Sequence, residues 1–239
     1  MMKLFNYSAL MVGILLMTSC SGDTTNSGSK SSSKVSQDCL MSYDYDYTRI
    51  LTLDDVKKHV AVDESTLETE QDLNNKTYGS VIYRWKSNRP DLVTKINNME
   101  IEHPDMNKVS MTKLSFYDSD DLKTYKSDDF VQLFNRGYDP MGKEEFDKLF
   151  DNLKKEYKDN PEMLETSRKL LETRMKSNYK KVDQVGQSAY WKWNDMWGLE
   201  MSVLYGNTKF YLEVKIDEDP QKNLDVATKI ANDILEECK

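Results

Sequence analysis

The stretch from Ser188 to Ile216, SAYWKWNDMWGLEMSVLYGNTKFYLEVKI, decides the fold of this chain. Apolar residues alternate with polar ones along three runs of it, and the apolar sets are Ala189, Trp191 and Trp193, then Leu199, Met201, Val203 and Tyr205, then Phe210, Leu212, Val214 and Ile216. A period of two with one apolar face is typical of antiparallel strands that are solvated on the other face. Gly206-Asn207 favours a type II′ turn, because glycine accepts a positive φ. We therefore expect a three-stranded meander.

An amphipathic helix is predicted after this meander. Asp219-Pro220 and Asn223 are helix start signals. The apolar residues that recur at helical spacing are Leu224, Ala227, Ile230, Ala231, Ile234, Leu235 and Cys238. Because the strands leave one apolar face uncovered, the helix is expected to lie across that face.

The first half of the folded part predicts further strands of the same sheet. Residues 81–85 alternate in hydropathy and predict one strand. Residues 109–117 predict a second strand, with Leu114 and Phe116 pointing inward. Between the two strands we expect a short helix near Asp91–Asn98 and then a loop.

The segment that begins the folded part predicts two short elements. Residues 43–47 alternate tyrosine with aspartate, which favours a short extended segment. Thr52 is a residue type preferred at a helix N-cap, and acidic residues follow it in the first turn. We therefore expect a short helix with Val56 and Val60 on one face.

A helical insert, residues 120–180, is predicted between the two halves of the sheet. Ser127 is expected to cap a helix over Asp128–Arg136, and Pro161 is expected in the first turn of the last helix. The apolar residues that these helices should bury are Phe130, Leu133, Phe134, Phe146, Leu149, Phe150, Leu153, Tyr157, Met163, Leu164, Leu170, Leu171 and Met175. We expect the insert to cover part of the second face of the sheet. One helical hairpin, with the charged segment Lys154–Asn160 at its tip, should project in the manner of an interaction module.

These patterns predict a single α+β globular domain over residues 38–239. It contains an antiparallel sheet of about five strands, packed against a C-terminal amphipathic helix, with the helical insertion between its two halves. The whole chain carries 33 basic and 41 acidic residues, a net charge of −8 at pH 7. This charge repels the phosphate backbone and argues against a nucleic-acid partner.

The N-terminus has the features of a targeting segment. Residues 1–19 contain the basic Lys3 and an apolar run, Ala9–Met17, that is too short to span a bilayer as a helix. Leu16–Cys20 resembles the lipobox of bacterial lipoproteins. The resemblance implies a lipoprotein signal peptide, cleavage before Cys20, and acylation of that cysteine. The alternative is an ordinary signal peptide with a chance cysteine.

Residues 20–37 are predicted to form a flexible tether behind the acylated cysteine. Serine, threonine, glycine and lysine dominate this segment, and Val35 is its single apolar residue after Cys20. Ser21 stands where an aspartate would suggest retention in the inner membrane by analogy with enteric lipoproteins. An outer-membrane location is therefore expected.

Two further cysteines lie near the two ends of the folded part. Cys39 is close to its start and Cys238 is close to its end. An exported protein meets an oxidising compartment, so a Cys39–Cys238 disulfide is predicted. The alternative is two unpaired thiols.

Three short segments resemble a group of known proteins. They are Leu51–Val56, Val81–Trp85 and Val182–Tyr190, in this order after a cysteine. The order is similar to that of small actinobacterial cell-envelope lipoproteins of unknown function and of related extracellular sensor-like domains, which implies an α+β domain without catalytic residues. The chain departs from them in its long insert and in Trp85, which stands where a paired cysteine often follows. The Ser19–Asp23 junction looks more like that of a Bacteroidetes-type lipoprotein.

Few residues suggest chemistry. The two histidines, His59 and His103, lie far apart in the sequence, so neither a three-ligand zinc site nor a Ser-His-Asp triad is indicated. Asp118–Asp121 begins like a calcium loop, but Lys123 stands where an EF-hand needs glycine, so helix capping is the preferred interpretation. No catalytic residue, metal site or cofactor is predicted.

Trp197 is the candidate contact residue. It falls in the predicted turn beside Gly198, whereas Trp191 and Trp193 share the core face with Ala189. An indole near a sheet edge can form a platform for a sugar or a peptide.

The sequence thus predicts a lipid-anchored cell-envelope protein that acts as a non-catalytic binding or interaction module. The alternative is a small-ligand carrier or sensor with a pocket between the sheet and the helices. The expected partners are the membrane, through the lipid anchor, and an envelope protein or a small ligand. Exposure on the periplasmic face or on the cell surface stays open.

Overall fold

A computed structural model describes residues 39–96 and 99–238 of the chain. The predicted signal peptide, the predicted acylation site Cys20 and the predicted tether over residues 20–37 lie outside the described residues. Within the described ranges, no helix combines the length and the apolar character needed to cross a membrane.

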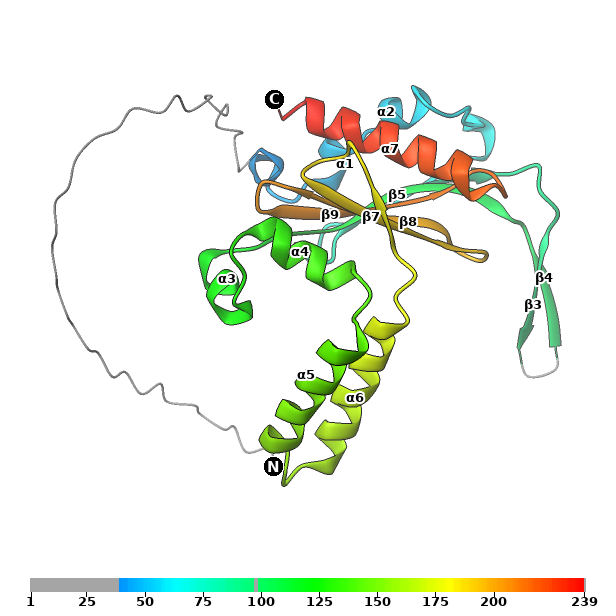
Figure 1. Cartoon of the computed structure of the whole chain (residues 1–239). Helices are drawn as coiled ribbons and strands as arrows, with labels where there is room; N and C mark the ends of the chain where they lie inside the picture. Colours follow the sequence, from blue (N-terminus) through cyan, green and yellow to red (C-terminus); the bar gives the residue numbers. More distant parts are fainter. Residues whose placement is uncertain (1–38, 97–98, 239) are drawn as a thin grey trace, which may run out of the picture. The chain divides into compact units, whose positions relative to one another are not determined.

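The domain is built on a seven-stranded antiparallel sheet with the order β1-β2-β5-β9-β8-β7-β6 (Figure 1). Its strands are β1 (Glu68–Asp72), β2 (Ser80–Lys86), β5 (Met106–Phe116), β6 (Lys180–Val182), β7 (Ser188–Asn194), β8 (Gly198–Tyr205) and β9 (Thr208–Lys215). The predicted meander is β7-β8-β9, and Gly206 in its turn has a φ of 64°. The α+β class and the antiparallel sheet are confirmed, and the edge strands β1 and β6 extend the sheet beyond the five strands expected.

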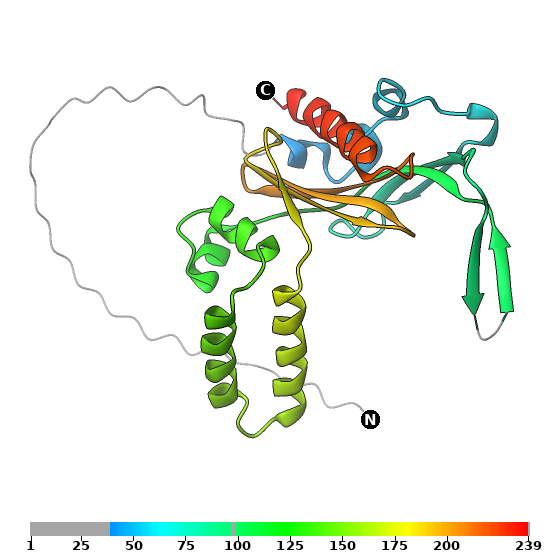
Figure 2. The same ribbon diagram turned by 45° about the vertical axis from the view of Figure 1, so that its right-hand side comes forward.

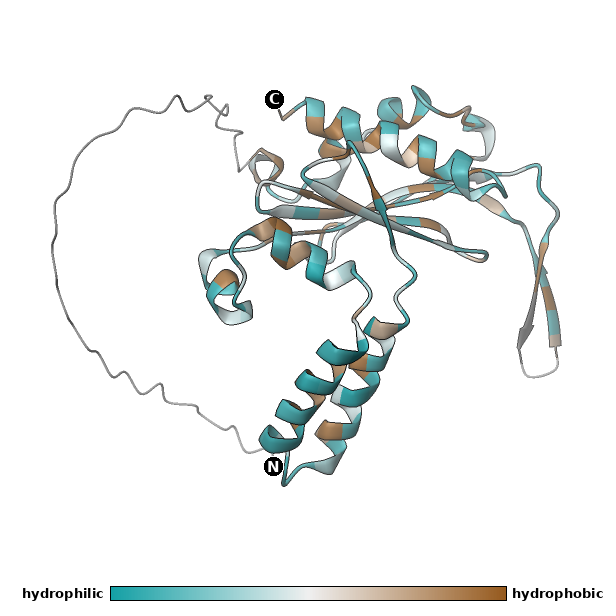
Figure 3. Cartoon of the chain, viewed as in Figure 1, coloured by the Kyte–Doolittle hydropathy of each residue, from teal (hydrophilic) through white to brown (hydrophobic). Residues whose placement is uncertain are grey.

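The first face of the sheet is covered by the C-terminal helix. This face carries α7 (Pro220–Glu236), together with the shorter elements η1 (Leu40–Tyr43), α1 (Tyr47–Ile50), α2 (Leu53–Lys57) and η2 (Glu64–Thr66). Asp219 caps α7, as predicted, by accepting a hydrogen bond from the Gln221 amide. Asn223 is fully buried, and its side chain accepts from the Ile216 amide at 2.8 Å. Figure 3 shows the apolar side of α7 turned toward the sheet.

The prediction of an extended segment over residues 43–47 is wrong. These residues form the end of η1, a tight turn and the start of α1. Asp46 caps α1 by accepting from the Thr48 amide, which a tyrosine–aspartate alternation does not reveal. Thr52 does cap α2, and it forms a capping box with Asp55, as its residue type indicates.

Strand β5 contains a bulge that changes which side chains point inward. Its register with β9 shifts between Thr112 and Ser115, and Lys113 has a φ of 54°. Leu114 is fully buried, as predicted, but Phe116 is 47% exposed. The expected burial of Phe116 is therefore wrong: Phe116 is the last residue of β5 and pairs with Thr208, the first residue of β9, at the end of the sheet.

The helix expected near Asp91–Asn98 is also wrong. Strands β3 (Leu92–Ile96) and β4 (Met99–His103) form a separate two-stranded sheet, called the ribbon below. The ribbon sequence contains Val93, Thr94, Ile96 and Ile101, whose branched side chains favour strands over helices.

The insert contains four helices, α3 (Ser119–Tyr125), α4 (Phe130–Tyr138), α5 (Lys143–Glu156) and α6 (Pro161–Met175). The cap of α4 is Asp129 and not Ser127, because the Asp129 carboxylate accepts from the Gln132 amide. Helix α4 packs on β7, where Phe134 meets Tyr190. In Figures 1 and 2, α4 lies on the opposite side of the sheet from α7. The second face is thus partly covered, as predicted.

Helices α5 and α6 form an exposed hairpin. No residue of α5 is buried, and Leu171 is the buried residue of α6. The expected burial of Met163, Leu170 and Met175 is therefore wrong; Leu170 is 65% exposed. Figure 2 shows both helices running away from the sheet side by side. The hairpin is the projecting arm that the sequence predicts.

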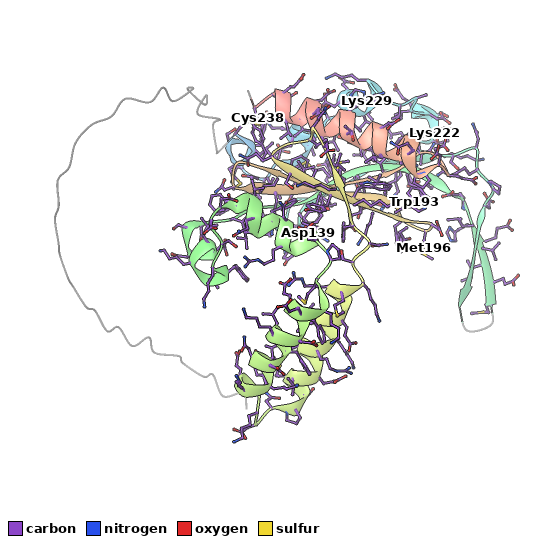
Figure 4. All side chains as sticks on the ribbon, viewed as in Figure 1. Asp139, Trp193, Met196, Lys222, Lys229 and Cys238 are labelled. Atoms are coloured by element: carbon purple, nitrogen blue, oxygen red, sulfur yellow. A yellow bond between two sulfur atoms is a disulfide. The ribbon has the colours of Figure 1, made fainter. Side chains whose placement is uncertain are left out.

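A disulfide joins Cys39 to Cys238, with their Cα atoms 5.4 Å apart. The predicted pairing is confirmed, and the alternative of two unpaired thiols is wrong. The bond links the residue before η1 to the segment that follows α7. Cys238 is labelled in Figure 4. Both ends of the folded part are therefore held on the same side of the sheet.

Candidate functional site

The half of the second face that lies under α4 is closed by hydrogen-bonded side chains. Tyr190 donates to Asp139 at 2.7 Å, and Ser188 donates to Asn135 at 2.6 Å. Tyr138 reaches the Tyr211 hydroxyl at 2.9 Å. Burial raises the pKa of Tyr138 far above its ordinary value, so this phenol stays a hydrogen-bond donor. These contacts hold α4 in place on this half of the face.

The other half of the second face is open and charged. Five neighbouring strands each contribute one side chain to it, and we call this set the charged face: Arg84, Lys108, Lys192, Glu200 and Glu213. Each side chain is 14–33% exposed, so all five are partly desolvated and still reachable.

Two glutamates stand directly opposite each other at the centre of the charged face. Glu200 of β8 pairs in register with Glu213 of β9. Like charges in this arrangement are unfavourable unless they are compensated. Lys192 compensates Glu200 at 3.2 Å, and Lys108 compensates Glu213 at 2.9 Å. The result is a row in which the two central glutamates are each paired with a lysine of the strand on their outer side.

Neutral side chains hold this row in place. The Tyr179 hydroxyl donates to Glu200, and the Ser110 hydroxyl donates to Glu213 at 3.2 Å. At the β1 side of the sheet, Arg84 pairs with Glu70. Each cation of the charged face therefore has its own carboxylate.

Trp197 stands at the rim of the charged face, in the turn between β7 and β8. The Asn194 side chain accepts hydrogen bonds from the amides of Met196 and Trp197 at 2.9 and 3.0 Å. Gly198 has a φ of 85°, and a Cβ there would lie 2.6 Å from the Val214 carbonyl oxygen. Trp197 is 64% exposed on this hydrogen-bonded turn. The predicted exposure is confirmed.

A hollow of about 450 Å³ lies between the Trp197 indole and the charged face. Its lining consists of all five residues of the charged face together with Asn194, Trp197, Gly198 and Leu199. Ligand sites of small molecules commonly measure about 300–1,000 Å³. The hollow therefore has the size of a ligand site, with one aromatic wall and a charged floor.

A second hollow, of about 430 Å³, lies on the ribbon side of Trp197. Apolar residues contribute most of its lining surface, and we call it the apolar hollow: Leu92, Pro104, Met106, Met196 and Trp197. His103 and the charged residues Arg84, Asp105, Lys108 and Lys215 also line it. Figure 4 places Met196 at the outer end of the turn, on the side of the ribbon. The charged hollow and the apolar hollow are therefore neighbours that share Trp197, Arg84 and Lys108.

A network of largely buried charged side chains holds the turn that carries Trp197. The Asp105 carboxylate accepts hydrogen bonds from the Arg89 guanidinium at 2.6 Å and from the Lys215 ammonium at 2.7 Å. The Lys215 ammonium also donates to the Met196 carbonyl oxygen at 3.1 Å. Burial alone would raise the pKa of Asp105, but the hydrogen bonds from the two cations outweigh it and lower that pKa. The network joins the base of the ribbon, β9 and the turn.

Sequence reasoning missed this network. Alternation along β9 puts Lys215 on the solvated face, yet Lys215 is buried. Its partner Asp105 lies 110 positions earlier in the chain. No local pattern links the two residues.

The other residues weighed from the sequence have structural roles. His59 pairs with Asp233 at 2.7 Å and so links α2 to α7. Asp118 forms a capping box with Asp121 at the start of α3, which confirms helix capping. Among the described residues, no group of three or more His, Cys, Asp or Glu side chains is placed to hold a metal ion. Cys20 lies outside the described residues.

A third hollow, of about 420 Å³, lies between the sheet and the insert. Phe116, Tyr117, Tyr125 and Lys209 are part of its lining. The Lys209 ammonium lies 4.4 Å from the centre of the Tyr117 ring, and burial lowers the Lys209 pKa. This is the kind of position that the alternative function, a small-ligand carrier, requires.

Comparison of the chain with protein-family models, curated proteins and solved structures finds no match.

Proposed function

We propose that this chain is a lipid-anchored cell-envelope protein that acts as a non-catalytic binding module through Trp197 and the surface beside it. The observation that carries the proposal is the exposure of a tryptophan on a turn fixed by Asn194, Gly198 and Lys215. Tryptophan is enriched among the residues that dominate binding energies. A contact residue on a rigid support binds without the cost of ordering a loop.

The anchor half of the proposal rests on Leu16–Cys20. The disulfide supports it, because such bonds persist in oxidising compartments outside the cytosol. Replacement of Cys20 by serine should remove the acyl label and shift the protein from the membrane fraction to the soluble fraction. A Cys20→Ser variant that keeps both the label and the membrane association would contradict the anchor.

The binding surface is placed at Trp197 and not on the α5–α6 arm. Leu170 is as exposed as Trp197, but it lines none of the three hollows described above. Single exposed apolar residues are ordinary on protein surfaces. At Trp197, by contrast, the exposed indole borders two hollows.

A pull-down from detergent-solubilised envelope tests this placement. Trp197→Ala should weaken retention of the bound component at least tenfold, as expected for a residue that contributes about 2 kcal/mol. Leu170→Ala is the matched control, because it removes an equally exposed side chain, and it should bind like the wild type. Equal loss in both variants would contradict the placement.

A small-ligand carrier is the second candidate function, and the hollow beside Lys209 favours it. The same assay separates the two candidates. Binding that survives Trp197→Ala and is lost in Lys209→Ala would favour the carrier.

A further inference from the structure

We infer that the hollow between Trp197 and the charged face binds an uncharged oligosaccharide. The inference rests on the proposed function, because it names the ligand class of the same surface. It is carried by two features that meet in one hollow: an exposed flat aromatic wall and a floor of compensated ion pairs.

The aromatic wall suits the apolar face of a sugar ring. Trp197 is 64% exposed, so one ring face can be covered by a ligand while the turn keeps its own hydrogen bonds. The face of an indole carries partial negative charge, which attracts the weakly positive C–H hydrogens of a pyranose. The C–H groups on one face of a pyranose chair form a compact apolar surface, which suits an indole better than a flexible acyl chain does.

The floor suits hydroxyl groups. A carboxylate can accept about four hydrogen bonds and an ammonium group can donate three. In the pairs Lys108–Glu213 and Lys192–Glu200, the lysine and the carboxylate each keep donor or acceptor capacity for a ligand. A hydroxyl both donates and accepts, so neighbouring hydroxyls of one sugar can bridge a lysine and a glutamate.

The charge balance points to a neutral ligand. Arg84 pairs with Glu70, Lys108 with Glu213, and Lys192 with Glu200. An anion would have to compete with these carboxylates, and a cation would have to compete with these basic side chains. A neutral polyhydroxyl ligand leaves the three ion pairs intact.

The same floor disfavours a protein partner in this hollow. Charged residues are depleted at the centre of protein interfaces, since burying them under an apolar partner removes their water without replacing its hydrogen bonds. Sugar hydroxyls replace those hydrogen bonds. The apolar hollow on the other side of Trp197 is where a peptide would fit better.

The test measures binding of defined saccharides to the full chain in detergent by isothermal titration calorimetry. The probes are cellohexaose, maltohexaose, xylohexaose and mannohexaose as neutral ligands, and hexagalacturonic acid as an anionic one. At least one neutral probe should bind. Hexagalacturonic acid should bind at least tenfold more weakly than the best neutral probe.

Variants assign the binding to the hollow. Trp197→Ala should weaken it at least tenfold, whereas Trp197→Phe should retain most of it because an aromatic face remains. Glu213→Gln should also weaken saccharide binding, because the substitution replaces a charged carboxylate, which accepts hydrogen bonds strongly, by a neutral amide. Met196→Ala is the control, since Met196 lines the apolar hollow alone and should bind the saccharide like the wild type. Thermal unfolding of each variant checks that it is folded.

Failure has distinguishable forms. Absence of binding to every neutral probe, or preference for the anionic probe, would overturn the inference. If envelope binding still depends on Trp197 in that case, the proposed function stands with another ligand. If replacement of Trp197 also leaves envelope binding unchanged, both the oligosaccharide site and the proposed binding function of Trp197 are contradicted. Release of shorter saccharides would keep the sugar site and overturn the non-catalytic assignment.

Discussion

Asp105 lies between two cations and stabilises the turn that carries Trp197. Its carboxylate holds Arg89 and Lys215, and Lys215 in turn holds the Met196 carbonyl. The network is buried, so its groups depend on one another for solvation. The position of Trp197 therefore depends on a residue outside the turn.

Removal of the Asp105 charge should destabilise the fold. Asp105→Asn leaves two buried cations without a counter-charge, and we expect a loss of about 3–5 kcal/mol in the free energy of unfolding at pH 7. Asp147→Asn is the control, because its exposed pair with Lys143 on α5 should contribute less than about 1 kcal/mol. Urea unfolding measures both. Equal effects in the two variants would contradict the importance of the network.

The pH dependence of the same variant has a definite sign. Hydrogen bonds and charges from Arg89 and Lys215 outweigh burial and lower the Asp105 pKa below 3.8. A lowered pKa means that the stabilisation is present above the ordinary value and is lost as the pH falls through the folded-state value. The difference in the free energy of unfolding between the wild type and Asp105→Asn should therefore become smaller below about pH 4. A gap that is constant down to pH 2 would contradict this.

At the scale of elements, local signals were predictable and non-local ones were not. The capping residues Thr52, Asp118 and Asp219 act on amides two or three positions away, so the sequence alone reveals them. The bulge in β5 depends on a distant residue: the Leu114 amide donates to the Tyr47 hydroxyl at 2.9 Å. Simple alternation cannot include such a contact.

The candidate site follows the same division. The exposure of Trp197 was predictable from its turn. The charged face was not, because it requires knowing that β2, β5 and β9 are neighbours. Only that order brings Arg84 and Lys108 beside Glu213.

The α5–α6 arm gives a prediction for an element. Replacement of residues 154–159 by a short glycine–serine turn should change the melting temperature by less than about 3 °C, because no residue of α5 is buried and Asn160, the N-cap of α6, is kept. Binding through Trp197 should be unchanged. Differential scanning fluorimetry and the envelope pull-down check the two statements. Loss of binding with unchanged stability would move the contact surface to the arm.

At the scale of the whole molecule, the disulfide closes the fold. Cys39 and Cys238 are 199 positions apart. In the unfolded state their bond therefore closes a loop that contains nearly all residues of the domain and restricts the conformations of that loop. The chain-entropy relation gives a stabilisation of about 5 kcal/mol as an upper bound. The two sheet faces are otherwise held separately, by α7 on one side and by α4 on the other.

Reduction of this bond should lower the melting temperature of the wild type. The Cys39→Ser/Cys238→Ser double variant is the control: it should melt at the lower temperature with or without reductant. Circular dichroism during heating measures both proteins. A wild type that melts at the same temperature in the presence and absence of reductant would contradict a structural role for the disulfide.

The central claim is that Trp197 contacts a partner or ligand in the envelope, and in-cell photo-crosslinking tests it most directly. A photoreactive amino acid is placed at position 197 or, as a control of equal exposure, at position 170. The account predicts an ultraviolet-dependent adduct from position 197 and none from position 170. An adduct from position 170 alone, or none from either position, would contradict it.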